Sequence, residues 1–204
     1  MNLESAVLNV GLFWALTTPH EYAHAWVATR LGDETPQRQG RLTLNPLAHA
    51  DWLGTVILPA ITSLMGGGFL GWGRPVSTDP AALRGRWNGL ALVALAGPLA
   101  NVVMAVVLGA AAAALAAAAL PSLAELAARG IVLSLYLALF NLLPVPPLDG
   151  SKLLPALRLP PAVYQELARF GFLLLIAAIT MSNLGRWLME GSWLGARAIL
   201  GLFA

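Results

Sequence analysis

Two histidines and a glutamate lie close together in the stretch LTTPHEYAHAW, residues 16–26. His20, Glu21 and His24 form the pattern H-E-x-x-H, in which residues i and i+4 fall on one face of a helix. Two imidazoles on one face can share a metal ion, and zinc is the ion typical of this pattern. The spacing therefore predicts a zinc site, with Glu21 beside the metal as an acid or base.

The same residues allow a purely structural interpretation. Thr18 could cap a helix that begins at Pro19, with Glu21 closing a capping box, and this role could coexist with metal binding. The apolar neighbourhood weighs against capping as the only role. An ionised side chain at membrane depth costs about 2.5–3.5 kcal/mol on insertion scales, so three ionisable groups within five residues indicate a shared purpose.

Composition places these residues in a membrane protein. The chain has 204 residues, of which 58% are hydrophobic and 11% charged, and its mean hydropathy is +0.72. A soluble domain of this size could not bury so much apolar surface. The net charge of +2 gives no basic excess that would favour nucleic acid as a partner. Without cysteine, only His, Asp and Glu remain as strong zinc ligands.

Apolar segments predict an all-α polytopic membrane protein with about four to six transmembrane helices. Residues 52–65 are short for a span and contain Pro59, which favours a half-buried or re-entrant segment. The glycine-rich residues 66–76 favour an extended, irregular or strand-like segment. The expected helices lie in the segments 4–30, 88–120, 130–148 and 163–181, and the proline cluster at the end of 130–148 must break the helix there. Residues 183–204 are interfacial or marginally spanning.

A catalytic zinc site needs a third protein ligand. The other acidic residue between apolar runs is Asp149, which follows a proline cluster in NLLPVPPLDG, residues 141–150. Asp149 could instead cap a short helix beginning at Ser151. Asn141 lies in the same stretch and could hold a substrate backbone or an oxyanion, or equally bond the chain near the Pro144 break.

Basic residues predict the orientation. If residues 52–65 do not cross the membrane, eight basic residues share one side and only Arg129 lies in the opposite loop. The positive-inside rule then places the loops 31–87 and 149–162 in the cytoplasm and the N-terminus outside. The histidine pair and Asp149 would both fall near the cytoplasmic ends of their spans.

These motifs together resemble the site-2 protease family of intramembrane zinc metalloproteases. The resemblance rests on H-E-x-x-H at 20–24 and on N-x-x-P-x-x-x-L-D-G at 141–150. GRLTLNP at 40–46, GWGRPV at 71–76 and AGPLAN at 96–101 strengthen it. It implies that His20, His24 and Asp149 hold one zinc ion per chain and that Glu21 is the catalytic acid/base. It further implies that the segment near Gly71 pairs with substrate as a membrane-embedded strand.

The resemblance implies a single intramembrane metalloprotease domain over residues 1–204, without a PDZ or nucleotide-sensing domain. The expected partners are the lipid bilayer and a membrane-anchored protein substrate, and the expected location is a bacterial or archaeal cell membrane. Two alternatives from other classes remain: a membrane divalent-metal transporter and a non-catalytic metal-binding membrane protein. A transporter usually needs polar ligands along a path through the membrane. A protein that only binds metal does not require the acid Glu21 between the histidines.

Overall fold

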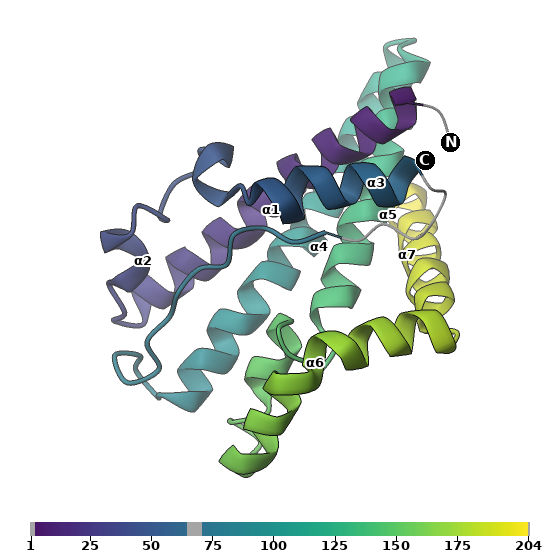
Figure 1. Ribbon diagram of the computed structural model, residues 1–204. Helices are drawn as coiled ribbons and strands as arrows, with labels where there is room; N and C mark the ends of the chain where they lie inside the picture. Colours follow the sequence, from purple (N-terminus) through teal and green to yellow (C-terminus); the bar gives the residue numbers. More distant parts are fainter. Residues whose placement is uncertain (1–2, 65–70, 204) are drawn as a thin grey trace. The chain divides into compact units, whose positions relative to one another are not determined.

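The computed structural model describes residues 3–64 and 71–203, which form helices and irregular connections without a β-strand (Figure 1). The all-α prediction is therefore confirmed for the described residues. The chain divides into two compact units, Met1–Gly97 and Pro98–Ala204. The elements are α1 (Leu3–Arg30), α2 (Thr35–Arg38), η1 (Pro46–His49), η2 (Trp52–Ile57), α3 (Leu58–Leu64), α4 (Trp87–Ala117), α5 (Pro121–Asn141), η3 (Asp149–Leu153), α6 (Pro161–Met181) and α7 (Leu184–Gly201).

The long helix α1 runs without a break through Pro19. Thr18 lies in its interior, where the hydroxyl donates to the carbonyl of Trp14 at 3.0 Å. The interpretation of Thr18 as an N-cap is therefore wrong, because the helix begins at Leu3 rather than at Pro19. α1 ends at Arg30, whose positive charge suits a helix C-terminus, and Gly32 follows with a φ of 105° that favours glycine.

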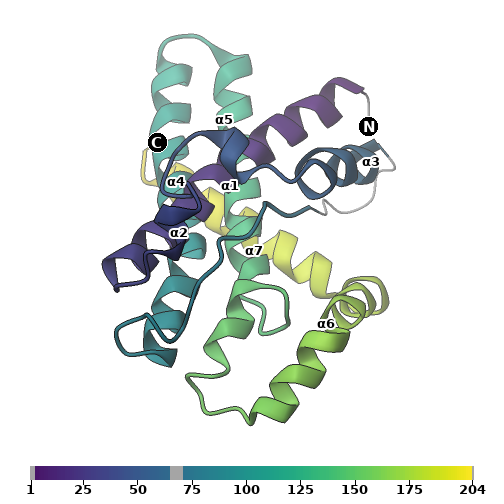
Figure 2. The ribbon, with the colours of Figure 1, turned by 60° about the vertical axis from the view of Figure 1, so that its left-hand side comes forward.

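The rest of the first unit folds back along α1, and both views show α3 beside the N-terminal half of this helix (Figures 1 and 2). Residues 52–64 form η2, a short π-helix, and then α3. Residues 71–79 have neither helix nor strand, which agrees with the irregular alternative, and a strand is not confirmed there. Residues 65–70 lie outside the described residues. Two hydrogen bonds nevertheless fix this segment, from the Trp72 amide to Gly54 O and from the Thr55 hydroxyl to Trp72 O, each 3.0 Å.

In the second unit α5 packs along α7. Their interface is an apolar cluster that includes Ala105 of α4, Ile131 of α5 and Ala196 of α7. α5 begins with Pro121 at its first turn, which costs no hydrogen bond there, and it ends at Asn141. The apolar segment 130–148 thus begins nine residues after the start of α5. The helix ends at Asn141, before Pro144, in agreement with the predicted break at the proline cluster.

Among the residues that the structure describes, three helices are long and apolar enough to cross a membrane: α4, α5 and α6. The number of about four to six spans and the re-entrant segment are not confirmed. The most apolar 18-residue stretch of α6 is only 11% buried within the protein. An apolar helix that is exposed along its length is suited to lipid rather than to water, which is consistent with a membrane protein.

Candidate metal centre

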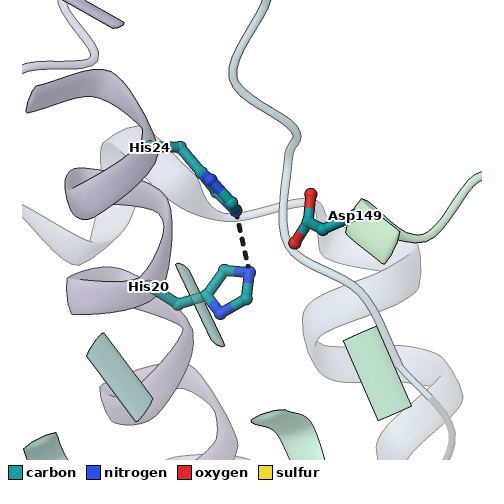
Figure 3. A group of neighbouring side chains, drawn as sticks. All are labelled: His20, His24 and Asp149. Carbon is teal, nitrogen blue, oxygen red and sulfur yellow. Dashed lines mark hydrogen bonds between the residues drawn. The ribbon is translucent and has the colours of Figure 1, made fainter. Parts of the chain in front are cut away.

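α1 brings the two predicted histidines together. His20 and His24 lie one helical turn apart, both are buried, and their Nε2 atoms are 3.1 Å apart (Figure 3). Two imidazole nitrogens that bind one tetrahedral zinc at 2.0–2.1 Å would be separated by about 3.3 Å. The pair therefore has the spacing that a shared zinc ion requires.

The other ring nitrogen of His24 orients its imidazole. Nδ1 lies 2.6 Å from the carbonyl oxygen of Val93 in α4. A carbonyl only accepts hydrogen bonds, so Nδ1 carries the proton and the Nε2 of the neutral ring keeps its lone pair. This contact is the kind of supporting hydrogen bond that fixes the tautomer of a metal-binding histidine.

Gly97 allows the backbone of α4 to approach the histidine pair. A Cβ atom built on Gly97 would collide with Nε2 of His24 and lie 2.6 Å from Nε2 of His20. The space beside the two nitrogens therefore depends on glycine at this position. The sequence analysis assigned Gly97 no role, although it belongs to the AGPLAN motif and stands inside an otherwise strongly helical segment.

Glu21 is buried and is covered by the segment that follows Gly71. A Cβ built on Gly73 would lie 3.3 Å from Oε1 of Glu21 and would collide with Thr17. Because Gly73 carries no side chain, the extended backbone passes directly over the carboxylate. The pKa of Arg41 is lowered by burial and by the charge of Arg74, and the opposing effect of Glu21 shows that the charges of Arg41 and Glu21 act on each other.

Asp149, whose side chain is drawn in Figure 3, begins η3 in the second unit. Its buried carboxylate forms an ion pair with Lys152 at 2.8 Å. Leu148, not Asp149, occupies the N-cap position of this 3-10 helix. The interpretation of Asp149 as a helix cap is therefore wrong. A Cβ on Gly150 would lie 2.6 Å from the Leu143 carbonyl oxygen, so the turn after the prolines is tight enough to need glycine.

The two predicted substrate-binding residues have structural contacts of their own. Asn141 closes the last turn of α5 by donating from Nδ2 to the Leu137 carbonyl at 3.0 Å, not to the region of Pro144. Gly71 packs tightly, because a Cβ there would lie 2.6 Å from Pro59 Cγ and 2.7 Å from the Gly54 carbonyl oxygen. Neither contact prevents a substrate role, which remains a prediction for both residues.

Comparison with known proteins decides the family. The chain is 35% identical over 199 residues to the Bacillus subtilis (strain 168) protein named "Putative zinc metalloprotease YwhC", and covers 86% of that protein and 92% of itself. It belongs to this zinc metalloprotease family. Two further relatives, each named "Putative zinc metalloprotease Rip2", are 35% identical in Mycolicibacterium smegmatis and 34% identical in Mycobacterium tuberculosis. The chain covers 66% and 64% of them, and these matches include 84% and 82% of the chain. No family model and no solved structure matches the chain.

Membership of this zinc metalloprotease family agrees with the donor chemistry of α1. His24 presents an Nε2 lone pair, His20 lies at metal-sharing distance, and an acidic side chain stands between them in the sequence. Catalytic zinc sites commonly use three protein ligands and leave one position open. The histidine pair has the donor atoms and the spacing for two of these ligands.

Proposed function

We propose that the protein is a zinc-dependent endopeptidase of the site-2 protease type, which hydrolyses peptide bonds within or near the transmembrane segments of membrane-anchored proteins. The observation that carries this proposal is the pair of Nε2 atoms 3.1 Å apart in α1, with buried Glu21 beside them. Apolar helices long enough to span a membrane and relatives named as zinc metalloproteases support it. Regulated proteolysis of membrane-anchored proteins is the corresponding biological role.

The proposed ligands are His20, His24 and Asp149, for one zinc ion per chain. Two imidazoles and a carboxylate are a donor set that could hold such an ion, and all three side chains are buried. Bound zinc would supply a Lewis acid that polarises the scissile carbonyl and lowers the pKa of water. Their burial in an apolar chain strengthens every electrostatic interaction within the site.

The remaining steps belong to the residues of the chain. Glu21 takes a proton from the attacking water and passes it to the leaving amine as the peptide bond breaks. The backbone near Gly71 and Gly73, which passes over Glu21, offers peptide groups to an extended substrate. The substrate helix must unwind locally, because its carbonyls are otherwise hydrogen-bonded within the helix. Asn141 is proposed to hold the substrate backbone beside the site.

Asp149→Ala should lower the zinc content of the folded protein and its activity together, because the ion would lose one of three protein ligands. The matched control is Lys152→Ala, which removes the ion pair of Asp149 but no ligand, and which should keep its zinc. Zinc is measured by elemental analysis of purified protein, and folding by circular dichroism. An Asp149→Ala protein that binds zinc as tightly as the wild type would remove Asp149 from the ligand set.

The proposed location is a cell membrane, with the active site toward the cytoplasm. This orientation follows from the excess of basic residues in the loops 31–87 and 149–162. Single cysteines in place of Arg38 and Glu125 should react with an impermeant reagent from opposite faces, without background from native cysteine. Labelling of both positions from one face would contradict the orientation.

A metal transporter is the competing function, and reconstituted vesicles separate the two. Purified protein in liposomes is given a library of tagged single-pass membrane proteins, with a zinc-sensitive dye trapped inside. The proposal predicts fragments of library members without a rise in internal zinc above that of empty liposomes. Zinc influx without any cleavage would favour transport.

A further inference from the structure

A pocket of about 680 Å³ opens in the first unit, and neither histidine of the pair lines it. Two arginines, Arg41 and Arg74, line this pocket, and their positive charges repel each other. The other lining residues are Gln39, Ala48, Pro75, Val76 and Ser77. This arrangement concentrates positive charge in a space large enough for a side chain of another molecule.

Hydrogen bonds to carbonyl groups of η1 hold both arginines in place, so the pocket is a fixed part of the fold. The Arg41 side chain is only 5% exposed and donates from Nη1 to the carbonyl of Ala48. The backbone amide of Arg74 donates to the carbonyl of His49 at 2.9 Å. His49 itself is buried and is held through Nε2 by the Thr43 carbonyl at 2.8 Å.

The charge in this pocket has no acidic partner at ion-pair distance. Among the described residues, no carboxylate lies within 4.0 Å of either guanidinium of the pocket. Burial lowers the pKa of Arg41, the charge of Arg74 lowers it further, and Glu21 provides the opposing effect. Two cations held together in this way favour the binding of an anion.

The wall of the pocket is continuous with the backbone that covers Glu21. Arg74 directly follows Gly73, whose added Cβ would lie 3.3 Å from Oε1 of Glu21. Adjacent Cα atoms are about 3.8 Å apart, so the pocket begins within one residue of the proposed catalytic carboxylate. A peptide that extends along this segment from Gly73 toward Arg74 would reach the pocket.

We propose that the Arg41–Arg74 pocket binds a carboxylate side chain of the substrate, a few residues from the scissile bond on the cytoplasmic side. The inference rests on the proposed protease function and adds a specificity determinant to it. Planar guanidinium groups match carboxylates through paired hydrogen bonds. The continuity of the pocket with the segment over Glu21 favours a peptide over a lipid headgroup as the source of the anion.

The test uses pairs of tagged single-pass membrane proteins, chosen from those cleaved in vesicles. Members of a pair differ only in Asp or Asn at one of the first six cytoplasmic residues next to the apolar segment. In phosphatidylcholine vesicles, wild-type protein should cleave the best Asp member with a kcat/KM about tenfold or more above its Asn partner, the expected effect of a charged hydrogen bond. Arg74→Gln should bring this ratio near one. Arg74→Glu should reverse the preference, so that a substrate with Lys at the same position is cleaved better than the Asp member.

Arg74 is exposed, so its substitution leaves the buried contacts of Arg41 intact. The control is Arg38→Gln, a surface arginine paired with Glu34, which should keep the wild-type ratio. Equal cleavage of Asp and Asn members by wild type at all six positions, or an unchanged ratio in Arg74→Gln, would overturn the inference while leaving the protease function in place. If Arg74→Gln only removes a stimulation by phosphatidylglycerol, the pocket binds lipid phosphate and the proposal is wrong. If the wild type cleaves no library member at all, the protease function itself fails and this inference falls with it.

Discussion

Glu21→Gln should leave zinc bound and reduce cleavage of membrane-anchored substrates by about 100-fold or more, the usual range for loss of a general acid or base. Glutamine has nearly the same shape as glutamate and can stay beneath Gly73, but it cannot accept a proton from water at neutral pH. The proposed ligands His20 and His24 are untouched. Zinc stoichiometry and the rate of fragment formation, measured on one preparation, check both parts of the prediction.

The matched control is Glu34→Gln at the N-cap of α2, where the carboxylate is 70% exposed and pairs only with Arg38 among the described residues. This variant should cleave at the wild-type rate, because an exposed ion pair contributes little. If Glu21→Gln still cleaved at a near wild-type rate, Glu21 would not be the acid/base and the hydrolytic mechanism would fail. If it lost zinc instead, Glu21 would be needed for metal binding.

Gly97→Ala should strongly weaken zinc binding and abolish cleavage. The added methyl group would collide with Nε2 of His24 and crowd Nε2 of His20, the two nitrogens proposed to bind zinc. Relief would require α4 to move away, which would also break the contact between Val93 and His24. Zinc affinity, measured by competition with a chelator of known affinity, should fall by at least about tenfold, as expected when supporting contacts of a metal site are lost.

Gly11→Ala is the matched control, since a Cβ at this position in α1 meets nothing within 4 Å. It should bind zinc normally and melt at the same or a higher temperature, because alanine favours a helix over glycine by about 1 kcal/mol. Normal zinc affinity in Gly97→Ala would show that the backbone of α4 does not limit the metal site. A circular dichroism spectrum separates loss of zinc from loss of the fold.

The pairing of His20 with His24 could be predicted from the sequence, because it depends only on helical periodicity. The support of His24 by Val93 could not, since it joins residues 69 positions apart. The importance of Gly97 is hidden for the same reason: a motif shows that glycine is present but not which atoms approach it. Tertiary contacts determine both features.

Local signals also misplaced some helix features. Thr18 and Pro19 form a typical helix start, yet α1 runs through them and the Thr18 hydroxyl bonds to the preceding turn. Asp149 follows prolines as a cap would, but lies within η3 and pairs with Lys152. In both cases a short-range pattern allowed two structures, and packing of the surrounding chain selected one.

The most direct test of the central claim is the position of the cut. A cleaved library protein is recovered from vesicles that contain the wild-type protein, and the masses of both fragments are measured, before and after zinc is removed and restored. The proposed function predicts complementary fragments that join within or next to the apolar segment, absent after chelation and recovered with zinc. Fragments that join only far from the membrane, or that form equally well in the chelated sample, would contradict a zinc-dependent intramembrane protease.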